Sequence, residues 1–365
     1  MQRVALVHDW LFWMRGGENC LHEILKINPK SDVYSLFYRT GKLENNIEEA
    51  FRGASFLNAL PYINSYYRFL LPVYKFGISD LSKKISNHRY DKVVSISHCV
   101  AKNIHLSYPV THISYCLTPM RYIWDQYENY FLNKPYEPIV GYFRERLIKD
   151  DLEGAKNVSE FFAISNFVAS RIKDYYGRES KVIYPPVDRD WLTPNYSMKN
   201  RSGYVAVSAL VPYKNNELII RAFNELGLPL TIVGKGPEYL KLRSIAKSNI
   251  KFLSNLTKQE LSQIYSQAKA LVFAAEEDFG IVPVEAQASG TPVICLNKGG
   301  ARETVTTLSG MFFDEPVLEL LSDAILKFED SYGDFNPEDC IKNSLNFDKS
   351  IFYSRFKSEI LDIEC

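Results

Sequence analysis

Two glutamates in the second half of the chain are placed to bind a ligand. The segment Glu277 to Ala286 leaves a predicted strand, Ala270 to Phe273, and turns into a helix at about Pro283, a residue favoured in a first helical turn. The amides of this helix start lie at the carboxyl end of a parallel strand, where open α/β sheets bind anions and other ligands. Glu277 and Glu285 flank that position, and carboxylates accept hydrogen bonds from paired hydroxyls. The spacing therefore predicts a ligand that combines a phosphate with a polyol.

A glycine pair closes the loop after the first predicted strand, Val4 to Val7. Because Gly16 and Gly17 have no side chains, the backbone there is able to approach a phosphate closely. A glycine pair by itself is equally typical of a plain turn. The loop from His8 to Glu18 is therefore a second, weaker candidate for phosphate binding.

A single histidine follows another strand of the first half. His98 lies just beyond the carboxyl end of the strand predicted over Lys92 to Ile96. Most single histidines are structural or solvated, so composition alone favours such a role. The position at a strand end keeps a functional role open.

These segments together resemble glycosyltransferase family 4, whose members are retaining enzymes of the GT-B fold. Glu277 and Glu285 match the Glu-x7-Glu motif of that family, and the likeness continues through residues 286–294 and 299–304. Either glutamate alone is more simply a solvated residue of a helix face, whereas the whole string in this setting is not common by chance. The resemblance extends over nearly the whole chain. It implies an α/β protein with two Rossmann-like domains that face each other across a deep cleft.

The resemblance implies a donor-binding set. Family members present an arginine and a lysine to the donor diphosphate from the loop after the first strand of the second domain; the lysine falls on Lys214, and Ala209 stands where many members have the arginine. A lysine near a helix start is disfavoured by the helix dipole unless an anion lies nearby, which favours a binding role for Lys214. Arg302 is the candidate substitute for the missing arginine. The expected donor-binding residues are Gly16, Gly17, Lys214, Asp278, Phe279, Gly280, Ile281, Val282, Glu285 and Arg302.

The resemblance also implies the catalytic and acceptor residues. Family members place a histidine at the position of His98 against the donor sugar, and the leaving diphosphate needs stabilisation by pre-aimed cations and amides. We expect His98, Glu277 and Lys214 to be catalytic, with no protein nucleophile. The string from Thr118 to Asp125 resembles members that transfer mannose from GDP-mannose in bacterial O-antigen, capsule or exopolysaccharide assembly. The expected acceptor-binding residues are Arg121, Tyr122, Trp124 and Asp125.

The resulting hypothesis is a retaining mannosyltransferase that moves mannose from GDP-mannose to a saccharide or polyprenyl-linked saccharide in bacterial surface polysaccharide synthesis. GDP-fucose, GDP-rhamnose and UDP-hexoses remain open as donors. A nucleotide-sugar epimerase of the same fold is one alternative, although it would need an additional acid/base carboxylate. A non-catalytic nucleotide-sugar-binding subunit of a polysaccharide assembly complex is another, which Ala209 favours.

We expect no cofactor and no metal. The Asp-x-Asp sequence, Asp188 to Asp190, follows two prolines in a predicted linker, away from the first-domain position of a metal-dependent glycosyltransferase. The cysteines lie far apart without Cys-x-x-Cys pairs, so they are expected to be reduced and mostly buried.

Alternating apolar and amphipathic segments predict βα units on two parallel sheets. The strands expected in the first sheet are Val4 to Val7, Val33 to Phe37, Lys92 to Ile96, His112 to Cys116 and Phe161 to Ile164. Those expected in the second are Tyr204 to Val207, Leu230 to Val233, Ile250 to Leu253, Ala270 to Phe273 and Pro292 to Leu296. The predicted domains are 1–188 for the acceptor, 189–345 for the donor, and a segment 346–365 whose helix, expected over Lys349 to Ile363, packs back on the first domain.

Size and charge limit the partners. A chain of 365 residues suggests about two domains, and 43 basic against 43 acidic residues give no overall field toward nucleic acid, which we do not expect as a partner. The first residues lack a secretory signal, and no apolar run reaches the roughly 18 residues that span a bilayer. We expect a cytoplasmic protein, with peripheral contact at the inner face of the cell membrane left open. The stretch Pro61 to Ile78 mixes aromatic rings and cations; a membrane interface and a core helix with a tyrosine-rich rim both remain open.

Overall fold

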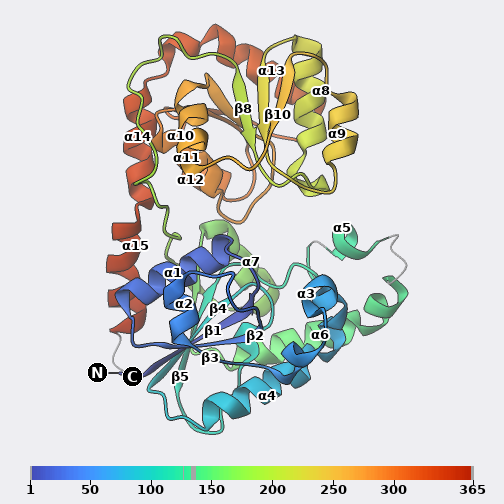
Figure 1. The fold of residues 1–365 in the computed structure, drawn as a ribbon, viewed down its shortest axis with the longest axis vertical. Helices are drawn as coiled ribbons and strands as arrows, with labels where there is room; N and C mark the ends of the chain where they lie inside the picture. The colour runs from blue at the N-terminus through green and yellow to red at the C-terminus, as the bar shows by residue number, and fades with distance from the viewer. Residues whose placement is uncertain (1, 126, 133–136, 363–365) are drawn as a thin grey trace. The chain divides into compact units, whose positions relative to one another are not determined.

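The computed structural model describes residues 2–125, 127–132 and 137–362, which form two compact units. Unit 1 comprises Met1–Pro185 and Phe352–Cys365, and unit 2 comprises Pro186–Ile351. The first boundary falls between the two linker prolines rather than after residue 188. The second falls inside the last helix rather than before residue 346. Figure 1 shows helices and parallel strands alternating along each unit.

Unit 1 contains a seven-stranded parallel sheet in the order β3-β2-β1-β4-β5-β6-β7. The five strands predicted for this sheet are confirmed. The two edge strands lie outside these five: β3, whose residues Phe-Arg-Gly-Ala form no apolar run, and β7, whose three residues Ser-Lys-Val come just before the linker prolines. The strands are β1 Val4–Leu11, β2 Asp32–Tyr38, β3 Phe51–Ala54, β4 Lys92–Ser97, β5 Thr111–Cys116, β6 Glu160–Ala163 and β7 Ser180–Val182.

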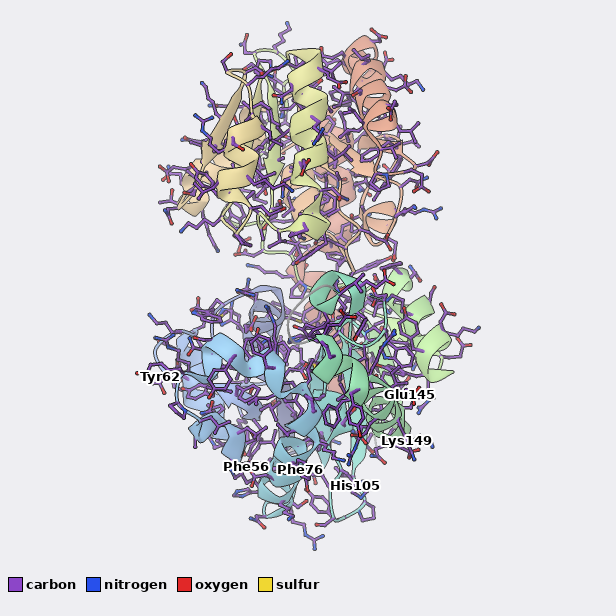
Figure 2. The ribbon with its side chains drawn as sticks, turned by 90° about the vertical axis from the view of Figure 1, so that its right-hand side faces the viewer. Phe56, Tyr62, Phe76, His105, Glu145 and Lys149 are labelled. Carbon is purple, nitrogen blue, oxygen red and sulfur yellow. The ribbon has the colours of Figure 1, made fainter. Side chains whose placement is uncertain are left out.

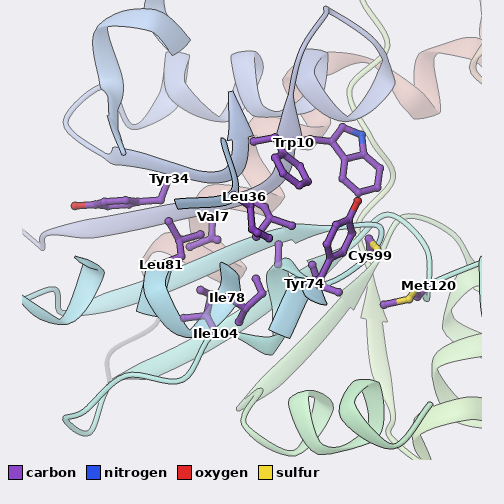
Figure 3. Packing of buried hydrophobic residues seen from close by; sticks show 14 of the residues in the cluster. Val7, Trp10, Tyr34, Leu36, Tyr74, Ile78, Leu81, Cys99, Ile104 and Met120 are labelled. Carbon is purple, nitrogen blue, oxygen red and sulfur yellow. The ribbon is translucent and has the colours of Figure 1, made fainter. Parts of the chain in front are cut away.

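The helices of unit 1 bury one apolar stripe each. On α4, the side chains of Tyr74, Ile78, Leu81 and Ile85 follow helical spacing and are all buried. Figure 3 shows Ile78 and Leu81 packed toward Leu36 and Val7 of the strands. The α-helices are α1 Gly16–Ile27, α2 Asn45–Ala50, α3 Ile63–Tyr66, α4 Tyr74–Ser86, α5 Tyr127–Phe131, α6 Glu137–Lys156 and α7 Asn166–Tyr176, with 3₁₀ turns at Phe56–Ala59, Tyr67–Val73 and Ala101–Asn103.

The C-terminal segment packs on unit 1. Helix α15, Lys349–Phe356, continues into a π-helical turn, Lys357–Leu361. Phe356 lies edge-on to Tyr115, and the fully buried Lys92 donates hydrogen bonds of 2.8 Å to the carbonyl oxygens of both Ile360 and Leu361. Lys92 thus satisfies carbonyl groups that a helix end leaves without partners. The predicted helix end, Ile363, lies outside the described residues.

Unit 2 contains a six-stranded parallel sheet in the order β10-β9-β8-β11-β12-β13. The five predicted strands are confirmed. Strand β13 was not predicted; it starts with Gly310, where a Cβ atom would lie 2.2 Å from the Val293 carbonyl oxygen, so only three apolar residues follow the glycine. The strands are β8 Tyr204–Val207, β9 Leu230–Val233, β10 Ile250–Leu253, β11 Ala270–Phe273, β12 Val293–Leu296 and β13 Gly310–Phe313. The helices are α8 Asn216–Leu226, α9 Tyr239–Ile245, α10 Lys258–Gln267, α11 Ile281–Ala288, α12 Ala301–Thr304, α13 Leu318–Asp330 and α14 Pro337–Ser344, with 3₁₀ turns at Pro212–Lys214, Tyr332–Asp334 and Leu345–Phe347.

The cysteines inside the described residues are free and buried, as predicted: Cys20, Cys99, Cys116, Cys295 and Cys340. Burial raises the pKa of Cys116 to about 12, so its thiol stays protonated and unreactive. Cys365 lies outside the described part of the chain. Across residues 2–125, 127–132 and 137–362, every helix is too short or too polar to cross a membrane.

Candidate functional site

Three loops at one edge of the unit 2 sheet carry the predicted donor-binding residues. They follow β8, β11 and β12, which are neighbours in the sheet, so their carboxyl ends meet at the same edge. Two hydrogen bonds join the loops: Asn215 Nδ2 donates to the Ala274 carbonyl oxygen at 2.8 Å, and the Gly300 amide donates to the Glu277 carbonyl oxygen at 2.7 Å. The structure therefore brings Lys214, Glu277 and the start of α11 into one region.

Lys214 and Glu277 form a close ion pair. Lys214 ends the 3₁₀ turn that follows β8, and Glu277 lies in the loop after β11. The two side chains are 12% and 22% exposed, so both are shielded from solvent but still reachable. Sequence analysis predicted both as catalytic residues but did not predict that they pair.

Helix α11 begins at Ile281, two residues before Pro283. Gly280 precedes it with a φ of 91°, a left-handed conformation that favours glycine. The amides of Ile281 and Val282 have no hydrogen-bond partners within the helix, since they belong to its first turn. Together with the helix dipole, they form a site that favours an anion.

Close backbone packing fixes this helix start. A Cβ atom at Gly299 would lie 2.5 Å from the Glu277 carbonyl oxygen, and one at Gly300 would lie 2.5 Å from the Phe279 carbonyl oxygen. Phe279 is buried and its ring lies 5.6 Å from that of Phe347, and Asp278 is also buried. The Gly-Gly sequence after β12 is thus needed to hold the loop that carries Glu277.

Glu285 has an unusual protonation equilibrium. Burial raises the pKa of Glu285 to about 7, against the lowering effect of a 3.0 Å hydrogen bond from the Tyr265 hydroxyl. At neutral pH this carboxyl is therefore protonated in part of the molecules. A protonated carboxyl donates as well as accepts, which suits recognition of hydroxyl groups.

Lys235 is a cation near Ala209 that the sequence analysis did not consider for binding. The Gly234-Lys235-Gly236 turn packs against the backbone of Ser208 to Leu210: the Leu210 amide donates to the Lys235 carbonyl oxygen at 2.9 Å, and a Cβ atom at Gly234 would lie 1.9 Å from the Ser208 carbonyl oxygen. Lys235 is exposed, and its ammonium group donates to Asn255. The predicted substitute, Arg302, is exposed on α12.

Asp9 is the main residue of unit 1 that sequence analysis missed. Its fully buried carboxylate accepts four backbone N–H groups of the turn after β4: His98 at 2.6 Å, Cys99 at 2.9 Å, Val100 at 2.5 Å and Ala101 at 2.7 Å. Hydrogen bonds to a charged acceptor are stronger than neutral ones, so this carboxylate fixes the whole turn. The feature of the sequence that could have indicated Asp9 is an acidic residue inside an apolar strand.

His98 lies on that turn, and its partly buried ring is affected by one carboxylate and three arginines. Its Nδ1 is 3.2 Å from the Asp9 carboxylate, and its ring meets the Trp10 ring edge-on at 4.4 Å. Burial lowers the pKa of His98; Asp9 opposes this effect, and the charges of Arg121, Arg68 and Arg15 add to it. His98 is therefore neutral at pH 7.

The glycine pair of unit 1 opens α1. A Cβ atom at Gly17 would lie 2.9 Å from the Leu117 side chain and 3.1 Å from His8 Nε2, so a side chain at residue 17 would displace these two side chains of the same unit. Gly16 is exposed. Burial raises the pKa of the adjacent Glu18 to about 7. A phosphate contact of this loop stays a prediction.

Most of the predicted acceptor residues make contacts inside unit 1 that attach their loop to the neighbouring helices. Tyr122 is buried among the core side chains, and its contact with an acceptor stays a prediction. Trp124 stacks on Tyr175 at 4.6 Å and donates to Asp151 at 2.9 Å, while Asp125 pairs with Arg171. Among these four residues, Arg121 acts on His98 through its charge.

The two aspartates of the Asp-x-Asp sequence form ion pairs with lysines. Lys349 lies 3.2 Å from Asp188 and also pairs with Asp190, and Lys258 lies 3.4 Å from Asp188. Among the residues that the structure describes, no group of three or more His, Cys, Asp or Glu side chains is arranged to hold a metal ion.

Part of the chain is similar to known proteins. Residues 195–347 match the family described as glycosyl transferases group 1. A GDP-mannose-dependent alpha-(1-6)-phosphatidylinositol monomannoside mannosyltransferase of Mycobacterium tuberculosis is 28% identical over 193 residues, which cover 44% of this chain and 50% of that protein. The O-antigen chain mannosyltransferase RfbU of Salmonella typhimurium is 29% identical over 210 residues, 51% of this chain and 57% of that one. The chain thus spans about half the length of the curated relatives it matches.

A solved structure supports the fold over the whole chain. Alr3699/HepE of Anabaena, solved in complex with UDP, superposes with a TM-score of 0.73 at 16% identity, over 99% of this chain and 100% of that one. This likeness shows the predicted GT-B fold class. Lys214, Glu277 and Glu285 all lie within residues 195–347, the part of the chain that matches the family described as glycosyl transferases group 1.

Proposed function

We propose that this chain is a retaining glycosyltransferase that moves mannose from GDP-mannose to a saccharide or polyprenyl-linked saccharide acceptor in bacterial surface polysaccharide synthesis. The observation that carries the proposal is the Lys214–Glu277 pair at the start of α11, with Glu285 on the same helix. The names of the relatives, GDP-mannose-dependent mannosyltransferase and O-antigen chain mannosyltransferase, support the choice of donor and product. We place the reaction on the cytoplasmic side of the membrane, where the protein makes peripheral contact.

Unit 2 binds the donor in this proposal. The ammonium group of Lys214 and the amides of Ile281 and Val282 interact with the diphosphate oxygens. Glu285 hydrogen-bonds hydroxyl groups of the nucleotide sugar, since its carboxyl both donates and accepts near neutral pH. Asp278, Phe279 and Gly280 shape the loop that presents these amides.

The transfer step exchanges one C–O bond for another. The bond between the anomeric carbon and the diphosphate oxygen breaks, and its electron pair goes to the diphosphate, which Lys214 stabilises. The acceptor oxygen forms the new bond on the same face of the sugar, and its proton passes to the departing phosphate oxygen. The transfer step, written in this way, requires no protein nucleophile and no metal.

Unit 1 supplies the acceptor side. His98 is neutral, so it hydrogen-bonds sugar hydroxyls without adding charge next to the developing positive charge on the sugar. Asp9 holds the turn that carries His98, and Arg121 contributes positive charge nearby.

Product analysis tests the proposal against its two alternatives. Purified protein is incubated with GDP-mannose and a lipid-linked or free saccharide, and the products are followed by nuclear magnetic resonance. We expect GDP and a new α-glycosidic linkage, unchanged by EDTA. Free or isomerised mannose without a new linkage would favour an epimerase, and donor binding without turnover would favour a binding subunit. A thermal-shift screen of nucleotide sugars identifies the donor, because a ligand that binds only the folded state raises Tm.

A further inference from the structure

Asp151 of α6 is a fully buried carboxylate outside the proposed catalytic set. It accepts hydrogen bonds from three residues that lie in three other segments of unit 1. Lys102, in the 3₁₀ turn after β4, donates to Oδ1, and both the Trp124 indole and the Tyr176 hydroxyl donate to Oδ2 at 2.9 Å. We call these four residues the Asp151 cluster.

Lys102 is the cation of this cluster. Its side chain is 1% exposed, and its ammonium group also donates to Asn103 at 2.9 Å and lies 5.0 Å from the centre of the Tyr176 ring. A buried ion pair is weak evidence for stability, because well-packed apolar side chains of similar volume are often at least as stable. The cluster adds direction instead, since each hydrogen bond fixes one segment relative to α6.

The first of these segments is the turn that carries His98. The Asp9 carboxylate accepts the amides of four consecutive residues that begin at His98, and Lys102 follows the last of them. The turn is therefore held at its start by Asp9 and at its end by Asp151.

Helix α6 lies beside the end of this turn. A Cβ atom at Gly154 would lie 2.0 Å from Asn103 Oδ1, so the helix backbone closely approaches the side chain that accepts from the Lys102 ammonium group. Figure 2 shows Lys149 of the same helix on the same side of unit 1 as His105, which follows the turn. Movement of the turn would thus require movement against α6.

The second segment is the loop that carries Arg121. Its Trp124 indole N–H donates to the cluster. Nearer the start of the loop, Arg171 of α7 donates to the Thr118 hydroxyl at 3.0 Å. Arg121 lies between these two points of attachment.

The two segments meet at His98. Burial lowers the pKa of His98 and the charge of Arg121 adds to this effect, so the two side chains are close enough to interact. Ring contacts make the same connection: Trp10 lies 4.4 Å from the His98 ring and 6.5 Å from that of Tyr122, the residue after Arg121. One carboxylate thus attaches both segments whose side chains meet there.

We propose that Asp151 is a positioning residue that fixes His98 relative to Arg121. It holds the turn of the first through Lys102 and the loop of the second through Trp124. The inference rests on the proposed function only for its effect on sugar transfer. The connection between the two segments is measurable without any transfer.

Fluorine nuclear magnetic resonance tests the connection. The chain has four tryptophans, so protein labelled with 5-fluorotryptophan gives four signals, which single Trp→Phe variants assign. Asp151→Asn removes the charge of the cluster, whereas the milder change Tyr176→Phe removes one hydroxyl and keeps the ion pair. We expect both changes to shift the signal of Trp124, which is a direct neighbour. We also expect both to shift the signal of Trp10, whose ring contacts His98.

Tyr90→Phe is the matched control. The Tyr90 hydroxyl bonds to that of Tyr34 at 2.8 Å and donates to Asp32 at 2.9 Å, at the opposite edge of the same sheet. Both Tyr→Phe changes therefore remove hydroxyl hydrogen bonds inside unit 1, and urea titration measures how much stability each one costs. We expect the control to leave the Trp10 signal in its wild-type position.

Steady-state kinetics with GDP-mannose tests the effect on transfer. We expect kcat to fall about tenfold in Asp151→Asn and about threefold in Tyr176→Phe, while the donor KM stays near its wild-type value because unit 2 binds the donor. Tyr176→Phe should cost less in the Asp151→Asn protein than in the wild type, since both changes act through one carboxylate. Tyr90→Phe should keep the wild-type kcat.

A Trp10 signal that stays in place in both cluster variants would overturn the inference, as would a loss of kcat no greater than that of Tyr90→Phe. The Tyr176→Phe protein decides both measurements if Asp151→Asn does not fold. Shifts of the Trp10 signal in a protein that transfers no sugar would contradict the proposed function alone. Wild-type transfer together with an unmoved Trp10 signal would contradict this inference alone.

Discussion

The Asp9 carboxylate accepts the backbone amide of His98 at 2.6 Å and lies 3.2 Å from Nδ1 of the same residue. One buried group thus fixes both the backbone and the surroundings of the ring. The carboxylate also opposes the effect of burial on the pKa of His98, although burial dominates and the imidazole stays neutral. Asp9 acts as a positioning residue, because its contacts are with the protein.

Asp9→Asn should weaken both the fold and the reaction. The asparagine amide nitrogen would face two backbone N–H groups that now donate to the carboxylate, and buried donors without acceptors are costly. We expect the free energy of unfolding to fall by about 2–4 kcal/mol in urea titration. Because the His98 turn loosens, kcat should drop by about tenfold while the donor KM stays near its wild-type value.

An exposed carboxylate provides the comparison for this variant. Asp323→Asn removes the charge of a side chain paired with Lys327 on α13. Exposed ion pairs contribute little, so neither stability nor kcat should change appreciably. An Asp9→Asn protein as stable and as active as the Asp323→Asn protein would show that the four amide contacts are unimportant.

Hydrophobic pattern was sufficient to predict the two parallel sheets. Ten strands have apolar runs that stand out from the amphipathic helices around them, such as Leu230 to Val233. Edge strand β3 lacks such a run, and edge strand β13 has only three apolar residues after its glycine. Their places in the sheets depend on pairing with β2 and β12, which is tertiary information.

The site was only partly predictable, because contacts between separate segments also depend on the tertiary structure. Motif likeness identified Lys214, Glu277 and Glu285, but the Lys214–Glu277 pair forms because neighbouring strands bring two separate loops together. In the sequence, Asp9 is only one polar residue within a strand. Its role becomes apparent in the structure, where amides of the turn after β4 donate to its carboxylate. The burial of Tyr122 was not predicted from the string Thr118 to Asp125, since pattern alone does not distinguish a core tyrosine from an exposed one.

Lys214→Met should abolish most of the transfer activity. The variant keeps an apolar stem of similar length but removes the cation that stabilises the leaving diphosphate. We expect kcat to fall on the order of 10²-fold, measured as GDP release from GDP-mannose. Lys327→Met, which breaks the exposed pair on α13, should leave kcat unchanged. Near-normal turnover by Lys214→Met would remove the diphosphate assignment from this loop.

Glu285→Gln should change how stability depends on pH. The pKa of Glu285 is about 7 in the folded protein and has an ordinary value of 4.5, so the folded state binds a proton more tightly than the unfolded chain. Its contribution to stability is fully present below pH 4.5 and is lost as pH rises through 7. Glutamine has no such dependence. Relative to the wild type, the unfolding free energy of the variant should rise by about 3 kcal/mol between pH 4.5 and a pH above 7.

A second variant, Tyr265→Phe, tests the pKa of Glu285 in the opposite way. The Tyr265 hydroxyl donates to Glu285 and lowers its pKa, so removing the hydroxyl should move the titration of Glu285 to higher pH. Urea titrations at several pH values give both curves. A constant difference between Glu285→Gln and the wild type at every pH would contradict the raised pKa.

Lys235→Ala should weaken donor binding more than Arg302→Ala does. The Gly234-Lys235-Gly236 turn packs backbone to backbone on Ser208 to Leu210, which puts Lys235 beside the loop whose Ala209 lacks a charged side chain. An exposed cation at that place is able to meet a diphosphate held by Lys214, although it must leave Asn255 to do so. We expect the Kd for GDP in calorimetry to rise about tenfold for Lys235→Ala, the equivalent of about 1.4 kcal/mol. The loss should shrink at high salt, because the interaction is between exposed charges. A larger loss of GDP affinity for Arg302→Ala would instead indicate that Arg302 is the second cation that binds the diphosphate.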